Sequence, residues 1–355
     1  MRWWAVAKAV VAHAPFVGVW WVGSAPVCVA VTVFIGISFV RKVGTVWATA
    51  MRGGFKGKRV VITGGSQGLG KAVATLCARE GALVTIVSRS KPKLDQARAE
   101  IVASVPGATV DAVPLDVSSA SSGDIAAVLG GADFVVANAG TGHARLVLDP
   151  GDHASYVKDL CELNVKGTLL VVTEAAKAMA CSSSGGRICL VSSAAGLISL
   201  PGYAYYSATK FGHRGAVAGA YHELKRNNVF LSCFYPGSIL TPGYEGELED
   251  RPHVTNRIET SCSDTSKPDA VARALLAGVK AGAREFSNEL LPQLVVDAPT
   301  GCLHIDILIA ILVAIVRSGW DLYLDAMALA HIPRQAPPTS STTEFSSLRA
   351  AAAHP

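Results

Sequence analysis

Short apolar runs alternate with helical patterns between Lys58 and Gly243, and this alternation constrains the fold more than any other feature. The first run, RVVITGG from Arg59 to Gly65, is β-branched and ends in glycines, as is typical of a strand buried in a parallel sheet. The next segment, KAVATLCAREG, has the apolar spacing of a helix and stops at a glycine. The further runs predicted to be strands are ALVTIVSR, DAVPLDV, ADFVVANAG, GRICLVSS and NVFLSCFYPG. Repeated strand–helix units predict an α/β fold with a doubly wound parallel sheet.

The pattern weakens after Gly243. Residues 245–269, EGELEDRPHVTNRIETSCSDTSKPD, are polar and predict a loop. The overlapping segment 268–282, PDAVARALLAGVKAG, predicts an amphipathic helix with Pro268 in its first turn.

The amino-terminal segment predicts a membrane anchor. Residues 9–40 contain no Asp, Glu, Lys or Arg, and ~20 apolar residues suffice for a spanning helix. A cleaved signal peptide is the alternative, although its apolar region is usually shorter. The basic residues that follow the segment are Arg41, Lys42, Arg52, Lys56, Lys58 and Arg59. By the positive-inside rule they predict that the rest of the chain faces the cytoplasm.

The carboxyl-terminal region contains a second apolar segment. Residues 302–316 are short for a spanning helix and include Asp306, so a span, a membrane-dipping helix and a buried helix all stay open. The tail is rich in Pro, Ser and Thr and predicts disorder. The predicted organisation is an anchor with its basic flank (1–56), a globular domain (57–300), a membrane-associated helical segment (301–333) and a disordered tail (334–355).

Composition excludes two classes of function. The net charge is only +5 and the basic residues form no stripe, which argues against a nucleic-acid partner. The eight cysteines are scattered without a C-x-x-C pair, which argues against a metal site such as zinc and fits a reducing compartment. Half of the residues are apolar and the mean hydropathy is +0.36, which fits a globular body with added membrane contact.

A glycine loop follows the first predicted strand. Gly64, Gly68 and Gly70 stand in a G-x-x-x-G-x-G pattern directly before a predicted helix. Glycines allow the backbone to approach a pyrophosphate, and the helix start offers free N–H groups. Plain turns also use glycine, so the loop alone does not establish a dinucleotide site.

The end of the next predicted strand indicates which dinucleotide would bind. NAD-binding folds place an acidic residue there, whereas this chain has Ser88 followed by Arg89. An arginine can pair with the 2′-phosphate of NADP(H), with Ser66 or Ser88 assisting. A solvated surface arginine is the alternative interpretation. The charge favours NADP(H).

The segment GYAYYSATK offers a catalytic tyrosine. An unperturbed phenol has a pKa of about 10, and a nearby cation lowers it. Residues four apart share one face of a helix, a condition that Tyr206 and Lys210 meet but Tyr203 and Tyr205 do not. Ser193 ends a predicted strand, and Asn164 lies on the helix before that strand. Alone, the spacing could equally come from a surface tyrosine beside a chance lysine.

Together these elements resemble the short-chain dehydrogenase/reductase family, which has a Rossmann-type doubly wound sheet. The matching elements are TGGSQGLG (63–70), LDV (115–117), NAG (138–140), Asn164, Ser193, YSATK (206–210) and PGSILT (236–241). They occur in the family's order and cover roughly residues 57–243. Dimers are usual in this family, so the resemblance implies a possible homodimer.

The resemblance implies a role for each catalytic position. Tyr206 would protonate the forming alkoxide, and Lys210 would lower its pKa and bind the nicotinamide ribose. Ser193 would hydrogen-bond the carbonyl, and Asn164 would hold a water that leads from Lys210 to a proton path. NADPH would supply the hydride.

The resemblance also implies where the cofactor lies. Asp116 and Val117 would contact adenine, and the NAG segment would line the cofactor channel. The hydroxyl of Thr241 would help to position the nicotinamide amide. The implied cofactor-binding residues are Thr63, Gly64, Ser66, Gly68, Leu69, Gly70, Arg89, Asp116, Val117, Asn138, Ala139, Gly140, Tyr206, Lys210, Pro236, Gly237, Ile239 and Thr241.

Residues 235–247, YPGSILTPGYEGE, resemble one group within the family, the 3-ketodihydrosphingosine reductases. This resemblance implies NADPH-dependent reduction of 3-ketosphinganine to sphinganine at the cytosolic face of the endoplasmic reticulum membrane. Glu245, Glu247 and Glu249 would suit a cationic headgroup, although they could simply form a solvated loop. The alternatives are a 3-ketoacyl-CoA reductase, a steroid or retinoid dehydrogenase, and a non-catalytic NADP(H) sensor or scaffold.

Overall fold

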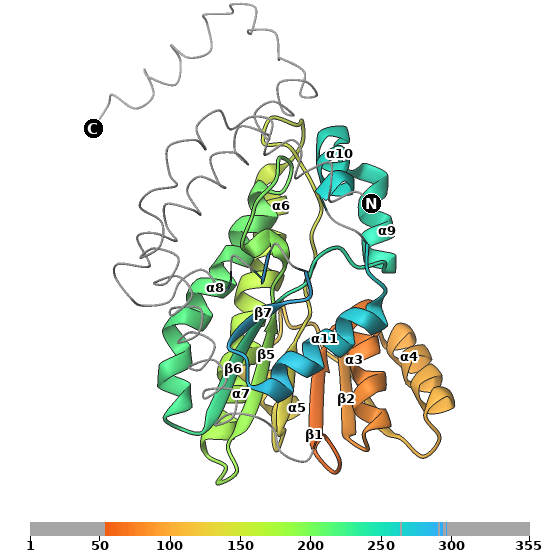
Figure 1. Cartoon of the computed structure of the whole chain (residues 1–355), viewed down its shortest axis with the longest axis vertical. Coiled ribbons are helices and arrows are strands. Elements are labelled where there is room, and N and C mark those ends of the chain that lie inside the picture. The colour runs from red at the N-terminus through yellow and green to blue at the C-terminus, as the bar shows by residue number, and fades with distance from the viewer. Residues whose placement is uncertain (1–53, 263–264, 290–291, 294–295, 297–355) are drawn as a thin grey trace, which may run out of the picture.

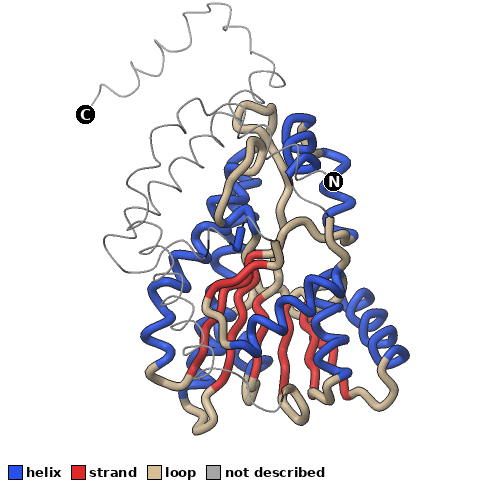
Figure 2. Tube along the Cα trace, viewed as in Figure 1, coloured by secondary structure: helices blue, strands red, loops and turns tan. Residues whose placement is uncertain are grey.

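The computed structural model describes residues 54–262, 265–289, 292–293 and 296. Their centre is a parallel sheet with strand order β3-β2-β1-β4-β5-β6-β7, and every strand pair is parallel (Figures 1 and 2). The strands are β1 Arg59–Thr63, β2 Leu83–Ser88, β3 Thr109–Pro114, β4 Phe134–Ala137, β5 Gly186–Val191, β6 Val229–Tyr235 and β7 Glu285–Ser287. The doubly wound parallel sheet that the sequence predicts is confirmed.

Helices cover both faces of the sheet, as Figure 2 shows with blue helices around the red strands. They are α3 Gly68–Arg79, α4 Lys91–Ser104, α5 Ser122–Leu129, α6 His153–Leu160, α7 Thr168–Ala180, α8 Ala204–Lys225, α9 Pro242–Asp250, α10 His253–Cys262 and α11 Pro268–Ala281. A π-helical turn, η2 Cys161–Gly167, and a short 3₁₀ turn, η3 Ala194–Gly196, complete them.

Side-chain alternation along the strands builds two apolar cores. Val60 and Ile62 pack into the layer with α3, α4 and α11, whereas Val61 packs into the layer with α5, α7 and α8. Both sides of β1 are therefore buried, which explains why its sequence is a continuous apolar run rather than an alternating one.

The structure differs most from the sequence-based prediction in the polar segment 245–269. We expected a loop, but most of the segment belongs to α9 and α10, which lie together beyond one end of the strands (Figure 1). Thr241 caps α9, and Pro242 occupies its first turn. Val254 and Ile258, four residues apart, are buried on α10. The apolar signal was missed because only two residues carry it in a charged background.

Two other differences concern the ends of the described region. The three-residue strand β7 was not predicted, because so short a run carries no pattern of its own. The predicted anchor, the 302–316 segment and the disordered tail lie outside the described residues. Within the described part, no helix combines the length and apolar character needed to cross a bilayer. The domain boundaries stay predictions.

Candidate active site

A cavity of about 560 Å³ lies along the carboxyl edge of the sheet. Its walls come from the segments after β1 to β6, including Asp116 and Val117 after β3, and from the first turns of α8. Strand order reverses between β1 and β4, which is where folds of this kind bind ligands. Every catalytic and cofactor-binding candidate selected from the sequence lines the cavity except Gly70 and Asn164, which pack directly behind lining residues.

The glycine loop brings the backbone to the cavity surface. Gly64 has a φ of 66° and Gly68 a φ of 54°, in the left-handed region that glycine occupies without strain. A Cβ at Gly70 would lie 2.2 Å from the carbonyl oxygen of Gly64, so no larger residue fits there. The amino end of α3 therefore comes close to the cavity, where it can receive an anionic group.

Thr63 joins the ends of β1 and β4. Its hydroxyl accepts hydrogen bonds from the backbone N–H groups of Asn138 at 3.0 Å and Ala139 at 3.1 Å. The Asn138 amide in turn donates to the carbonyl oxygens of Thr63 at 3.0 Å and Gly64 at 3.3 Å. The NAG segment is thereby fixed against the glycine loop.

A polar, basic corner follows β2. The hydroxyl of Ser66 donates to that of Ser88 at 3.1 Å, and Arg89 lines the cavity beside them. Lys93, in the first turn of α4, also lines this corner and was missed from the sequence. The available signal was a second basic residue four positions after Arg89.

Tyr206 and Lys210 lie one turn apart on α8, as their spacing predicts. The Lys210 Nζ lies 5.6 Å from the centroid of the Tyr206 ring and donates to the carbonyl of Val191 at 3.4 Å. Ser193, two residues after the end of β5, lines the same cavity and lowers the pKa of Tyr206 as a hydrogen-bonding partner would. A Cβ at Gly142 would lie 2.6 Å from the Tyr206 ring, so the loop after β4 holds that ring closely. The structure thus brings three of the four catalytic candidates together at one point of the cavity.

Asn164 is fully buried in the π-helical turn η2. Its Oδ1 accepts from the Thr141 N–H at 3.0 Å, and its Nδ2 donates to the Thr141 carbonyl at 2.8 Å. Its own carbonyl lies 2.6 Å from Nε2 of His213; a carbonyl only accepts, so this nitrogen must carry the proton. These bonds fix Asn164 behind the site, and its role in a water path stays a prediction.

Burial governs the protonation states of these groups. It raises the pKa of Tyr206 above the usual range, a rise that the hydrogen bond from Ser193 opposes and the charges of Glu247 and Glu259 increase. Burial lowers the pKa of Lys210 to about 8. We expected Lys210 to lower the pKa of Tyr206, but in this structure burial outweighs any such effect. Near neutral pH, Tyr206 therefore keeps its proton while Lys210 stays mainly cationic.

The other two tyrosines of the segment face elsewhere. The Tyr205 ring lies 5.6 Å from that of His153 and 5.9 Å from that of Tyr156, so it faces α6. The Tyr203 ring lies 5.8 Å from that of Tyr206, but its hydroxyl contacts two carboxyl groups. Of these three tyrosines, Tyr206 is the one whose ring lies beside Lys210.

The segment after β6 forms the wall opposite the glycine loop. The Pro236 carbonyl accepts from the Ala194 N–H at 2.7 Å, and Ile239 pairs with Ser266 in an isolated bridge. The Thr241 hydroxyl accepts from the Tyr244 N–H at 3.2 Å, which leaves its own proton to donate. A Cβ at Gly68 would lie 2.9 Å from the Thr241 methyl group, so the two walls meet there.

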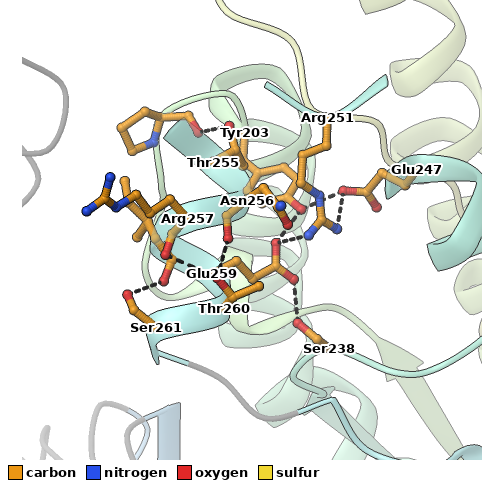
Figure 3. A network of polar contacts seen from close by, with 12 residues as sticks. Tyr203, Ser238, Glu247, Arg251, Thr255, Asn256, Arg257, Glu259, Thr260 and Ser261 are labelled. Carbon is orange, nitrogen blue, oxygen red and sulfur yellow. Dashed lines mark hydrogen bonds and ion pairs between the residues drawn. The ribbon is translucent and has the colours of Figure 1, made fainter. Parts of the chain in front are cut away.

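An ion-pair network closes the cavity at the α9–α10 end (Figure 3). The Arg251 guanidinium lies 3.0 Å from Glu247 and 2.9 Å from Glu259. The Tyr203 hydroxyl lies 2.5 Å from Glu247 and 2.8 Å from Glu259, and the Ser238 hydroxyl donates to Glu259 at 2.5 Å. Tyr203, Glu247 and Glu259 line the cavity.

This network refines the cation-binding role suggested for the three glutamates of α9. Glu247 lines the cavity, whereas Glu245 and Glu249 are exposed. Glu259 was missed, because in the sequence it is one charge in a polar stretch without a motif. Only the packing of α10 against Tyr203 brings it to the cavity.

The chain matches the family model for short chain dehydrogenases over residues 58–252. Among curated proteins, it is 32% identical to a 3-dehydrosphinganine reductase of Arabidopsis thaliana, over 69% of this chain and 74% of that protein. It is also 32% identical to a 3-dehydrosphinganine reductase of Danio rerio, over 67% and 72% of the two chains. A 3-ketodihydrosphingosine reductase of Bos taurus is 33% identical, over 62% and 68%.

Solved structures share the fold. A short chain dehydrogenase/reductase family protein is 28% identical and superposes with a TM-score of 0.57, covering 66% of this chain and 96% of that one. A short-chain dehydrogenase from Sphingobium yanoikuyae in complex with NADPH is 20% identical with a TM-score of 0.57, covering 80% and 99%.

Proposed function

The chain belongs to the short-chain dehydrogenase family, and from this premise we propose that it reduces the 3-keto group of 3-ketosphinganine to sphinganine with NADPH. The reductase part of the proposal rests on the meeting of Tyr206, Lys210 and Ser193 in one cavity. The substrate part rests on the relatives named above, which carry the names 3-dehydrosphinganine or 3-ketodihydrosphingosine reductase.

The residues present fit NADPH. The loop around Gly64 and Gly70 has no room for side chains, as close approach of a pyrophosphate requires. Arg89 and Lys93 supply two cations in the corner after β2, where they would hold a 2′-phosphate. The Thr241 hydroxyl would donate to the nicotinamide amide. Bound NADPH supplies the hydride, and the protein supplies orientation and electrostatics.

The protein's own groups prepare the ketone. Ser193 donates a hydrogen bond to the carbonyl oxygen and so fixes its position beside Tyr206. Tyr206, which keeps its proton at neutral pH, donates it to the oxygen as negative charge develops there. The Lys210 ammonium then stabilises the resulting phenolate. Asn164 fixes the backbone of Thr141, which lines the cavity.

We further propose that the protein works at the endoplasmic reticulum membrane, with its catalytic domain facing the cytosol, and that it forms a homodimer, as is usual in the family. The apolar amino-terminal segment, the basic residues after it and a lipid ketone substrate support the membrane part. Protease protection in sealed microsomes tests it: the catalytic domain should be digested without detergent. Survival of that domain until detergent is added would contradict the orientation.

The function is tested by NADPH oxidation in membranes that contain the full-length protein. We expect turnover with 3-ketosphinganine and none with a long-chain 3-ketoacyl-CoA offered separately. The two carboxyl groups that line the cavity support this preference, because they would repel a CoA polyanion. Turnover of the CoA ester alone would reject the sphingoid substrate and leave the catalytic assignment in place.

A further inference from the structure

Charge does not balance at the α9–α10 end of the cavity. Glu247 and Glu259 present two carboxyl groups, and the only guanidinium that contacts them among the described residues is that of Arg251. The side chain of Arg251 is 1% exposed, and those of Glu247 and Glu259 are 13% and 10% exposed. With both carboxyl groups ionised, the network carries one uncompensated negative charge, shielded from solvent but open to the cavity.

The number of hydrogen-bond donors in this network is also smaller than the number of acceptors. The Tyr203 hydroxyl lies within hydrogen-bond distance of both carboxyl groups, yet a phenol has a single proton to donate. One proton shared between two carboxyl groups leaves both acceptors with capacity for a further donor. Burial raises the pKa of Glu247, because a buried carboxylate lacks the solvation that stabilises its charge. A cation arriving from the cavity would supply the missing donor and balance the charge.

We propose that Glu247 and Glu259 bind the ammonium group of the substrate, so that this network selects ketones with an amine on the carbon next to the carbonyl. The assignment rests on the proposed function, because the sphingoid ketone carries such an amine. Arg251 and Ser238 act as positioning residues: Arg251 holds both carboxyl groups, and Ser238, which also lines the cavity, donates a hydrogen bond to Glu259.

The location of the network fits an amine beside the reacting carbonyl. The Tyr203 ring lies 5.8 Å from that of Tyr206, and the Tyr203 hydroxyl is hydrogen-bonded to the carboxyl groups of Glu247 and Glu259. The charges of Glu247 and Glu259 also reach Tyr206, since both raise its pKa. A substrate whose ketone contacts Tyr206 would therefore place an adjacent amine near the carboxyl groups. Its alkyl chain would extend away from these two carboxyl groups.

The test compares two substrates that differ only in the amine. We would measure kcat/KM for 3-ketosphinganine and for the matched long-chain 1-hydroxy-3-ketone without the amino group, in full-length wild type and in Glu259→Gln and Glu247→Gln variants. Each substitution should lower kcat/KM for the amino ketone by roughly 10- to 100-fold, the value of a hydrogen bond to a charged group. The deamino ketone should change by less than about threefold.

Glu249→Gln is the matched control, because it removes a charge from the exposed side of the same helix. It should leave both substrates unaffected. NADPH binding, measured by nicotinamide fluorescence, should be retained in every variant and reports that the fold is intact. If a buried variant fails to fold, the wild type alone still decides, because it must prefer the amino ketone over the deamino ketone.

Two outcomes separate this inference from the proposed function. If the wild type reduces 3-ketosphinganine but does not distinguish it from the deamino ketone, or if the Gln variants lose both activities equally, the ammonium site is rejected and the function stands. If the wild type reduces neither ketone, the proposed function itself fails.

Discussion

The two ends of the cavity, the cofactor end at the glycine loop and the substrate end at α9 and α10, are formed by different kinds of groups. The cofactor end relies on main chain: glycine conformations, the start of α3, and backbone groups bonded to Thr63 and Asn138. The substrate end relies on charged side chains from separate helices, held together by Arg251. The first end therefore depends on strand order, which the fold fixes, whereas the second depends on how α9 and α10 pack. Substitutions should therefore affect the two ends independently.

The largest expected effect is at the point where the two ends meet. Tyr206→Phe removes the proton donor and should lower kcat by about 10²- to 10⁴-fold, the usual contribution of general acid catalysis. NADPH affinity, measured by fluorescence titration, should change little, because the ring stays in place. Tyr205→Phe is the control, since that ring faces α6 and should leave kcat unchanged. Full activity of Tyr206→Phe would reject the catalytic assignment.

Arg251→Leu should disrupt the ion-pair network at the substrate end and leave the cofactor end intact. It leaves two buried carboxyl groups without their cation and should lower the free energy of unfolding by about 3–5 kcal/mol. Urea unfolding, followed by far-ultraviolet circular dichroism, measures this loss of stability. Arg273→Leu, on the exposed face of α11, should stay within about 0.5 kcal/mol of wild type. Equal stability of the two variants would mean that the network does not hold α9 and α10 in place.

Arg89→Ala should weaken the cofactor end alone. Loss of a charge-assisted contact to the 2′-phosphate should raise the Kd for NADPH by roughly 10- to 100-fold and leave the Kd for NADH nearly unchanged. Lys93→Ala should show the same selectivity with a smaller effect. Isothermal titration of both dinucleotides measures these values. Equal losses for NADPH and NADH would contradict the phosphate assignment.

The smallest expected effect is a pH dependence. Burial lowers the pKa of Lys210 to about 8, so the cation that stabilises the Tyr206 phenolate is lost as the pH rises through that value. The rate of ketone reduction at saturating substrate should fall above about pH 8, by up to about tenfold per pH unit. In Lys210→Arg, any residual activity should lack this fall, because arginine keeps its charge. A wild-type rate that stays flat to pH 10 would exclude Lys210 as the group responsible.

Much of the fold could be predicted because its signals are local. The strand runs from Arg59 to Tyr235 each lie in one continuous segment, and their alternation with helices implies a parallel sheet. The segment 245–269 could not be predicted in the same way. Among the described side chains its helices bury only two apolar residues, Val254 and Ile258, so no periodic stripe stands out from the charged background.

For the site, local spacing places the residues that lie on a single element. The glycine loop and the pair of Tyr206 and Lys210 stand at such spacings, because a helix turn or a strand end sets their geometry, and the joint match with the family's other motifs marks them as functional. The charges that join them depend on how separate helices pack. Glu247 faces the cavity while Glu249 does not, and Glu259 arrives from another helix. Helix packing selects these charges. Because it depends on contacts between residues far apart in the chain, it produces no recognisable spacing in the sequence.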